Sequence, residues 1–349
     1  VGSEMCIRDR HYNELKASYL FVDIAHKVAA YQEAHPEKEI IRLGIGDVTQ
    51  PLAKCVVDAM HDAVTEMGTK EGFHGYGPEQ GYPFLKQAIQ GYYAGRGTKL
   101  DEDEIFISDG AKSDLANVLG LFDVDNTVLV PDPVYPTYVD DNVTDGRKII
   151  YGRTSQENGF LGMPDDSVKA DIIYICSPNN PTGALMSKEL LGSIVEIARG
   201  VGAYILCDEV YRHLTQEDEW CESIVDLYEK GISVSSMSKA FSLAGLRMGW
   251  IATHDEAARK AFLSHRDYNL ISCGMFDDAI ASIALRHSDV MLKRNQRIVR
   301  ENLAILDDWI KENPHFFYTK PKAGTTALVY YDFDIPSYCL LYTSPSPRD

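Results

Sequence analysis

The sequence predicts an α/β protein built on a three-layer, mostly parallel sheet. Its middle part alternates short apolar runs with longer amphipathic stretches, the pattern of strands that alternate with helices in a parallel sheet. The apolar runs contain almost no polar residues, which indicates strands covered on both faces. Residues able to do chemistry follow directly after several of these runs. Because ligands bind beyond the carboxyl ends of parallel strands, we expect the functional site at that edge of the sheet.

The elements are expected in a simple order. Apolar residues recur at helical spacing from Leu15 to Tyr31, and Ile40–Gly46 has the pattern of a short strand. Helices are expected over 52–67 and 81–94, with a glycine-rich break between them. The further strands are expected at 104–108, 127–131, 171–177, 204–209 and 232–238, and the further helices at 111–122, 188–202 and 286–312.

The length of 349 residues allows two or three domains. We expect a large domain over 48–275, and a smaller α+β domain formed by 11–47 together with 276–338. The end segments 1–10 and 339–349 lack the periodicity of their neighbours. We interpret them as non-native tails, with ordinary frayed termini as the alternative.

Charge and composition exclude several classes of function. The net charge of -18 argues against a nucleic-acid partner, because phosphate binding needs clustered basic residues. No apolar run approaches the roughly 18–20 residues that span a bilayer, so no membrane segment is expected. The seven cysteines show no metal-ligand spacing, so no metal site is expected, and free thiols suit a reducing compartment. Without a visible signal peptide, we expect the cytoplasm.

Four motifs appear in a fixed order: three lie at the ends of predicted strands, and the fourth is an arginine eight residues beyond the lysine of the third. They are SPNNPTG (177–183), DEVYR (208–212), SMSK (236–239) and Arg247. Together they resemble the signature of class I/II aminotransferases, the fold-type I enzymes that depend on pyridoxal phosphate (PLP). The resemblance covers roughly residues 12–330. A dinucleotide-binding fold is excluded, because LGIGD lacks the third glycine of its fingerprint.

Two of these residues have a direct physical reason. A lysine amine can form a Schiff base with an aldehyde, and burial activates it, so Lys239 is the residue expected to hold the cofactor. A buried carboxylate keeps the pyridine nitrogen of PLP protonated, and Asp208 follows four apolar-type residues. The alternatives are a solvated surface lysine and a helix-capping aspartate.

The resemblance implies the rest of the cofactor site. Asn180 and Tyr211 would hydrogen-bond the phenolic oxygen of the ring, and Tyr135 would stack on it. The phosphate would be held by one set of residues, namely Ser236, Ser238, Arg247 and the strand-to-helix junction Gly110, Ala111 and Lys112, where a helix N-terminus favours anions. Tyr76 would reach the phosphate from a neighbouring subunit, which implies a homodimer; a locally packed loop tyrosine is the alternative.

The first half of the chain is more specific. The segments 17–27, 41–52, 75–89, 107–114 and 131–142 together resemble the LL-diaminopimelate aminotransferases of lysine biosynthesis, which exchange an amino group with 2-oxoglutarate. The resemblance assigns substrate contacts to Tyr19, Gly46, Lys112, Asn180 and Asn269, and to Glu79 of the partner subunit. Glu79 could pair with the distal ammonium of the substrate. A solvated glutamate is the alternative.

The second half is closer to aspartate-type or general class I aminotransferases. SKAFSLAGLRMGW, which carries Lys239, and the segment 265–278 both point that way. The chain is therefore either a divergent subfamily member or a mosaic of two sequences. Alternative functions are an aspartate-like or broad-specificity aminotransferase and a carbon–sulfur lyase on the same fold. A regulatory PLP-fold domain is disfavoured, because no DNA-binding region accompanies it.

The resemblance also implies a C-terminal arginine that binds the substrate carboxylate. A guanidinium suits this task because it binds a carboxylate through two hydrogen bonds. The only arginine beyond residue 300 is Arg348, in the atypical tail. We therefore expect a C-terminally truncated small domain, weak transamination, and apolar surface left uncovered on the helix over 286–312.

Overall fold

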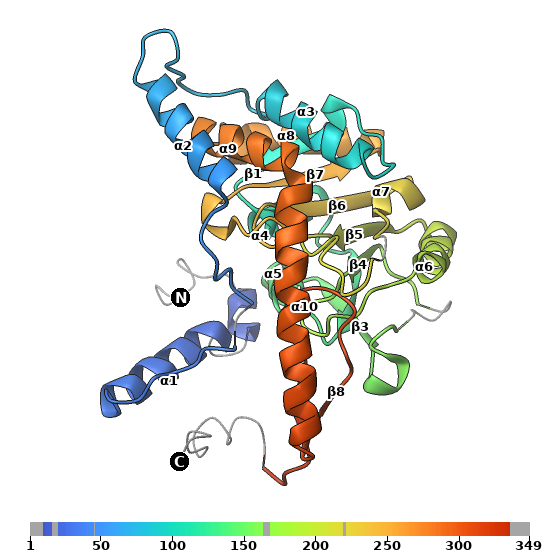
Figure 1. Ribbon diagram of the computed structural model, residues 1–349. Helices are drawn as coiled ribbons and strands as arrows, with labels where there is room; N and C mark the ends of the chain where they lie inside the picture. The colour runs from blue at the N-terminus through green and yellow to red at the C-terminus, as the bar shows by residue number, and fades with distance from the viewer. Residues whose placement is uncertain (1–9, 16–19, 45, 163–167, 219–220, 336–349) are drawn as a thin grey trace, which may run out of the picture.

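A seven-stranded sheet forms the centre of the computed structural model, which describes residues 10–15, 20–44, 46–162, 168–218 and 221–335 (Figure 1). The strand order is β1-β7-β6-β5-β4-β2-β3. Strand β7 runs antiparallel to both of its neighbours, and the other six strands run in one direction. The prediction of an α/β fold with a mostly parallel sheet is therefore confirmed. Tyr19 and the predicted tails, apart from Arg10, lie outside the described residues.

The strands and helices follow one another along most of the chain. The sheet strands are β1 (Ile105–Ser108), β2 (Thr127–Asp132), β3 (Lys148–Arg153), β4 (Ile172–Cys176), β5 (Tyr204–Asp208), β6 (Gly231–Ser236) and β7 (Gly249–Thr253). A separate hairpin pairs β8 (Phe316–Tyr318) with β9 (Val329–Tyr331). The helices are α1 (Leu20–Ala34), α2 (Lys54–Met67), α3 (Pro83–Ala94), α4 (Ala111–Asn117), α5 (Thr137–Thr144), α6 (Lys188–Val201), α7 (Ile224–Leu227), α8 (Glu256–Asn269), α9 (Met275–Arg286) and α10 (Ser288–Glu312).

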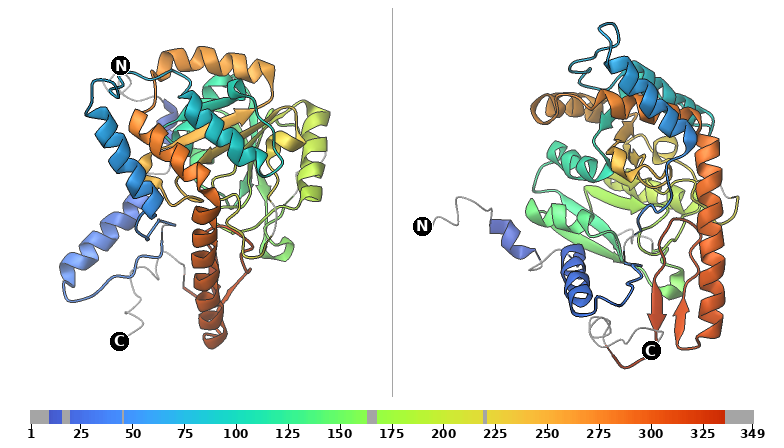
Figure 2. Two further views of the ribbon diagram at one scale, coloured as in Figure 1. Left: turned by 45° about the horizontal axis from the view of Figure 1, so that its top comes forward. Right: turned by 60° about the vertical axis from the view of Figure 1, so that its left-hand side comes forward.

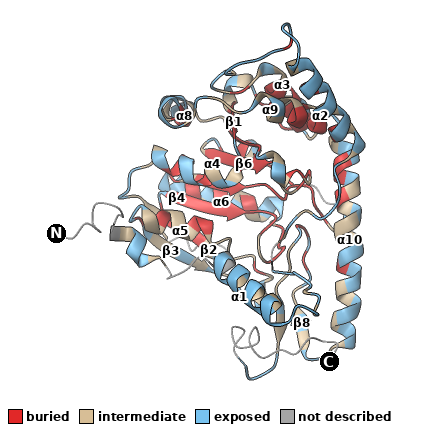
Figure 3. Ribbon diagram, turned by 90° about the vertical axis from the view of Figure 1, so that its left-hand side faces the viewer, coloured by how far each residue is buried: buried red, intermediate tan, exposed pale blue. Residues whose placement is uncertain are grey.

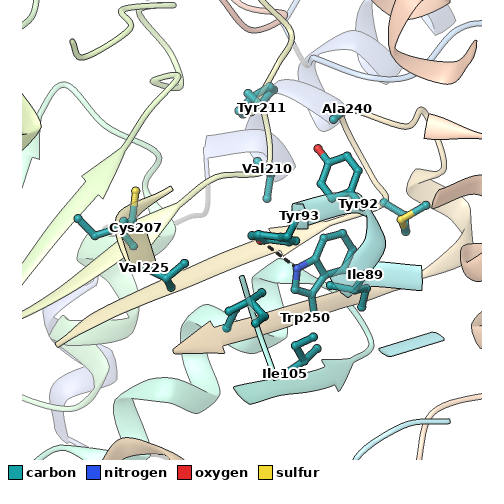
Figure 4. Close-up of a cluster of buried hydrophobic side chains, with 14 of the residues drawn as sticks. Ile89, Tyr92, Tyr93, Ile105, Cys207, Val210, Tyr211, Val225, Ala240 and Trp250 are labelled. Atoms are coloured by element: carbon teal, nitrogen blue, oxygen red, sulfur yellow. Dashed lines mark hydrogen bonds between the residues drawn. The ribbon is translucent and has the colours of Figure 1, made fainter. Parts of the chain in front are cut away.

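The sheet has an apolar core on each face, as the polar-poor strands predict. Ile105 and Ile107 of β1 face one core, which α3, α6 and α9 cover, while Phe106 between them faces the other core under α4, α5 and α8. Burial colouring shows the central strands β4 and β6 buried between these layers (Figure 3). In the first core the indole of Trp250 donates to the Tyr93 hydroxyl at 3.2 Å (Figure 4). Both faces of every central strand are therefore excluded from water.

Short sequence signals fix the helix ends around the sheet. The Ser187 hydroxyl accepts from the Leu190 amide at 3.3 Å and caps α6, which ends at Gly202 with a φ of 78°. The Asp255 carboxylate accepts from the Ala258 amide at 2.6 Å and caps α8. These caps set where each helix begins relative to the strand before it, and hence where the strand-end loops lie.

Three elements differ from the sequence-based expectation. The expected strand Ile40–Gly46 is not one in its described residues, and Ile41 and Leu43 are exposed with no strand to pair with. The helix expected over 111–122 is α4 followed by a 3-10 turn at Val118–Leu121. The helix expected over 286–312 begins at Ser288, because α9 ends at Arg286 and the chain changes direction at His287.

Two helices extend past the sheet. Helix α10 runs along one side of the molecule from α9 to the β8–β9 hairpin, and α1 projects from the body on the side where the chain begins (Figures 1 and 2). Ile305 and Trp309 on α10 are exposed. Among the described residues, no helix combines the length and the apolar character that a membrane crossing requires.

Candidate active site

Three predicted residues follow neighbouring strands at one edge of the sheet. Cys176 of β4 lies opposite Asp208 of β5, and β5 pairs with β6 in the same direction. Asn180 follows β4, Asp208 ends β5, and Lys239 follows β6. The carboxyl ends of the three strands therefore bring these side chains to the same edge, where ligands bind in such sheets.

Lys239 is half-buried, and its amine is in contact with a segment far away in the sequence. Its Nζ donates to the backbone carbonyl of Gly46. Burial lowers the pKa of the Lys239 amine, while the carboxylates of Asp47 and Asp208 act in the opposite direction. A lowered pKa increases the fraction of neutral, nucleophilic amine, which is what bonding to an aldehyde requires.

Gly46 reaches the lysine because the C-terminal part of the chain lies directly behind it. A Cβ atom at this position would lie 3.1 Å from Thr325 Oγ1 and 3.2 Å from Thr326 Cγ2. Thr325 also hydrogen-bonds the side chain of Tyr211. Segments near both ends of the described chain therefore meet close to Lys239 and Tyr211.

Asp208 is buried and held at both carboxylate oxygens. Its Oδ2 accepts from the Tyr138 hydroxyl at 2.5 Å, and its Oδ1 accepts from the Val210 amide at 3.0 Å. Burial raises the pKa of Asp208 to about 6, and the hydrogen bond from Tyr138 limits this rise. The carboxylate is therefore fixed in direction and close to the point at which it exchanges a proton near neutral pH.

Tyr138 is a further residue of the site that the sequence motifs did not indicate. It lies on α5 beneath the site, stacked on Tyr174 with ring centroids 5.1 Å apart, and it is almost completely buried. The available signal was the second tyrosine of DPVYPTY, one helical turn beyond Tyr135. Nothing in the local pattern reveals that this hydroxyl meets Asp208, because the contact depends on the order of β2, β4 and β5 in the sheet.

Tyr211 and Asn180 lie together. The Asn180 Nδ2 donates to the Tyr211 hydroxyl at 3.4 Å. Tyr211 lies at the edge of the apolar core that also contains Val210 and Ala240 (Figure 4), and burial raises the pKa of its hydroxyl. Tyr135 lies near enough to influence that hydroxyl electrostatically.

Two glycines pack closely at the same edge of the sheet. Gly110 has a φ of 127°, and a Cβ atom there would lie 2.5 Å from Arg247 Nη2. A Cβ atom at Gly249 would lie 2.9 Å from Gly110 Cα. Only glycines allow β7, the β1–α4 turn and the Arg247 guanidinium to approach so closely. Ala111 follows in the same turn, and the Ser236 hydroxyl nearby accepts from the Ser238 amide at 3.3 Å.

Other predicted residues are not brought into this cluster. Tyr76 is 88% exposed, and Glu79 and Asn269 are exposed as well. Within the described part of the chain, none of these three side chains contacts Lys239 or Asp208. Lys112 is exposed on the first turn of α4, where its ammonium opposes the rise that burial causes in the pKa of Asp141.

Comparison with known proteins agrees with this geometry. The model of the family "Aminotransferase class I and II" matches residues 38–332. The chain belongs to this family. The LL-diaminopimelate aminotransferase of Agathobacter rectalis is 45% identical over 262 residues, which are 70% of this chain and 65% of that protein. The chain therefore spans less than two thirds of that relative. The Desulfosudis oleivorans enzyme of the same name is 40% identical over 77% of this chain and 70% of its own length.

Solved structures show the same fold. L,L-diaminopimelate aminotransferase from Chlamydomonas reinhardtii superposes with a TM-score of 0.82 at 31% identity, covering 91% of this chain and 83% of that one. A PLP-dependent aminotransferase from Streptococcus suis gives a TM-score of 0.77 at 32% identity, covering 90% and 84%. The family predicted from the four motifs is thereby confirmed.

Proposed function

We propose that the protein is a PLP-dependent aminotransferase that moves an amino group between LL-diaminopimelate and 2-oxoglutarate. The observation that carries this proposal is that the half-buried Lys239 amine and the buried Asp208 carboxylate interact electrostatically at the sheet edge where Gly110 also approaches Arg247. The substrate is inferred from relatives at 40–45% identity that bear that activity in their names.

The residues present fit PLP. The missing Cβ atom at Gly110 leaves room beside the Arg247 guanidinium, and a guanidinium with nearby hydroxyls and backbone amides is the donor set that a phosphate needs. Ser236 and Ser238 supply those hydroxyls, and Gly110, Ala111 and Lys112 form the adjoining turn. At the other end, Asp208 would face the ring nitrogen, with Asn180 and Tyr211 beside the phenolic oxygen and Tyr135 beside the ring face.

The proposed chemistry divides between the cofactor and the chain. PLP supplies an aldehyde that bonds to amines and a ring that accepts the electron pair left when the substrate α-carbon loses its proton. The Lys239 amine would hold the cofactor at its aldehyde carbon until the amine of the substrate replaces it there, and the freed Nζ would then take the proton from the α-carbon. Asp208 would keep a proton on the ring nitrogen, and the hydrogen bond from the Tyr138 hydroxyl would hold the Asp208 carboxylate in place for that role.

We further propose a homodimer in which Tyr76 and Glu79 complete the site of the partner subunit. Large apolar side chains are exposed on the N-terminal segment, on the loop before α3 and around the C-terminal end of α8, namely Ile41, Leu43, Phe73, Tyr76, Tyr268 and Ile271. Exposed apolar groups of this kind favour a protein partner. The Glu79 carboxylate has no hydrogen-bond or ion-pair partner among the described residues, so it is suited to bind an ammonium group across that interface.

We place the enzyme in the cytoplasm. Among the described cysteines, Cys55, Cys176, Cys207 and Cys273 carry free thiols, and Cys176 and Cys207 are buried. Unpaired thiols are typical of a reducing compartment.

A screen of amino donors tests the proposal. The holoenzyme is given 2-oxoglutarate together with LL-diaminopimelate, aspartate, alanine or an aromatic amino acid, and glutamate formation is measured. LL-diaminopimelate is expected to have the highest kcat/KM. A preference for aspartate would replace the substrate with that of the aspartate-like alternative. Product release from a single amino acid without 2-oxoglutarate would instead indicate a lyase.

A further inference from the structure

The loop that carries Tyr76 and Glu79 is held from behind by two buried charged side chains. This presenting loop spans residues 75–82 and turns outward between α2 and α3. Behind it lie Arg266 of α8, which is 6% exposed, and Asp278 of α9, which is 1% exposed. Neither residue is among those that surround Lys239, and the proposed chemistry leaves both unexplained.

Arg266 joins the loop to the sheet. Its Nη2 donates to the carbonyl of Glu79 at 3.2 Å and also to the carbonyl of Ile107 in β1. The guanidinium therefore bonds the backbone of Glu79 while the Glu79 side chain stays exposed. Two carbonyls from separate segments share one guanidinium, which fixes their relative position.

Asp278 holds the end of the same loop. Its Oδ2 accepts from the Tyr82 amide at 3.3 Å. Between the two contacts, Gly81 has a φ of 90°, and a Cβ atom there would lie 2.3 Å from Ile107 Cγ1. The loop closes on itself where the Gly81 amide donates to the Pro78 carbonyl at 3.0 Å. The presenting loop is thus packed against β1 and held by hydrogen bonds to Arg266 and Asp278.

Burying these two charged side chains is unfavourable if their only role is to stabilise the fold. Burying an arginine and an aspartate removes both from water, and apolar residues of similar size would often stabilise a fold as well or better. Three buried side-chain atoms also lack a hydrogen-bond partner among the described residues: Gln80 Oε1, Arg266 Nε and Asp278 Oδ1. Residues that lower stability in this way are expected where position matters more than stability.

We propose that Arg266 and Asp278 are positioning residues that hold Glu79 and Tyr76 in the direction needed to enter the partner subunit's site. They act in trans, because Arg266 and Asp278 of one subunit position the loop that enters the site around Lys239 of the other subunit. The inference rests on the proposed homodimer, and it adds to that proposal the device that aims the shared residues.

Mixed dimers with one live site separate this role from a general effect on folding. One subunit carries Lys239→Ala, so the only live site is that of its partner, and the loop serving it comes from the Lys239→Ala subunit. Arg266→Met is then placed either on the loop-donating subunit or on the Lys239-bearing subunit. We expect the KM for LL-diaminopimelate to rise about tenfold in the first arrangement, as for one misaligned charge-assisted hydrogen bond, and to stay unchanged in the second.

Matched controls isolate the loop contacts. Arg259→Met removes another α8 arginine, which pairs with Asp103 and, among the described residues, makes no hydrogen bond to the loop. It should have no effect in either arrangement. Asp278→Asn keeps an acceptor for the Tyr82 amide and should retain the wild-type KM, whereas Asp278→Leu should behave like Arg266→Met. Hydrogen exchange at the Tyr82 amide should rise only in the Leu variant, which gives a measurement independent of turnover.

The outcomes are distinguishable. A mixed dimer that carries no substitution at Arg266 or Asp278 and is inactive would contradict the proposed shared site itself. If that dimer is active but Arg266→Met raises the KM at the site of its own subunit, or has the same effect in both arrangements, the positioning role of Arg266 is contradicted. The shared site itself would still stand. Unchanged exchange at Tyr82 in Asp278→Leu would also overturn it.

Discussion

The pocket around Lys239 and the presenting loop at residues 75–82 are built in opposite ways. The pocket lies at the ends of β4, β5 and β6, and its carboxylate is buried with both oxygens bonded. The loop leaves Tyr76 and Glu79 exposed and has its buried contacts only behind them. One chain thus brings Asn180, Asp208 and Lys239 to a single edge of the sheet, whereas the side chains of Tyr76 and Glu79 in the loop are exposed.

The largest expected effect concerns the residue that defines the pocket. Lys239→Ala should lower turnover by at least about 10³-fold, because it removes both the covalent attachment and the base. The variant should also lose the yellow colour and the borohydride-reducible bond of the holoenzyme. Lys230→Ala, at a surface lysine bonded to the Gly202 carbonyl, is the control. Labelling of a different lysine after reduction and peptide mapping would contradict the assignment.

Asp208→Asn tests the buried side of the same pocket. Loss of the negative charge should lower kcat by about 10²–10⁴-fold, because the ring nitrogen no longer keeps its proton. Binding of the cofactor should be much less affected, since the phosphate cradle is intact. The kcat is measured by steady-state kinetics, and cofactor binding is measured by titration of the apoenzyme with PLP. A preserved kcat would remove Asp208 from the mechanism.

Glu79→Gln tests the exposed region separately. If Glu79 binds the distal ammonium of LL-diaminopimelate, the KM for that donor should rise about 10-fold to 100-fold, the range for a charge-assisted hydrogen bond. PLP affinity should not change, because the pocket lies in the other subunit. Glu71→Gln, at an exposed glutamate of the preceding loop, serves as the control. An equal rise in the KM for alanine as donor would mean that Glu79 does not recognise the distal ammonium group.

The smallest of these effects should come from Tyr138→Phe. The Tyr138 hydroxyl stabilises the ionised form of Asp208, so its removal should raise the pKa of Asp208 further above about 6. As the pH is lowered, activity that needs the ionised carboxylate should then be lost at a higher pH than in the wild type. The acid side of the kcat profile should therefore shift upward by about one pH unit. Tyr174→Phe, which removes a neighbouring hydroxyl without touching Asp208, should leave the profile in place.

The same contrast explains what the sequence could predict. The strands β4, β5 and β6 are short apolar runs, and each is followed by a polar motif, so the sheet edge and Asn180, Asp208 and Lys239 could be placed from pattern and resemblance. Strand β7 was not foreseen, because its residues Gly249–Thr253 follow the lysine motif closely and run antiparallel. The Tyr138–Asp208 bond also depends on strand order, which local pattern does not contain.

Exposed segments were harder to interpret for a physical reason. Ile40–Gly46 has the apolar pattern of a strand, yet Leu43 is exposed and the segment pairs with no strand of the chain in its described part. Arg266 and Asp278 lie on helices whose patterns show only amphipathic character. Their contacts to the loop join residues almost 200 positions apart, a relation that only the tertiary structure reveals.

The most direct test of the contrast mixes two inactive variants. Tyr76→Ala removes a residue of the presenting loop, and Lys239→Ala removes the centre of the pocket. If each site takes its loop from the partner subunit, a mixed dimer holds one intact site and should recover about half of the wild-type rate per dimer. If both residues belong to the site of their own chain, a verified mixed dimer would show no recovery, and the division between pocket and loop would be wrong.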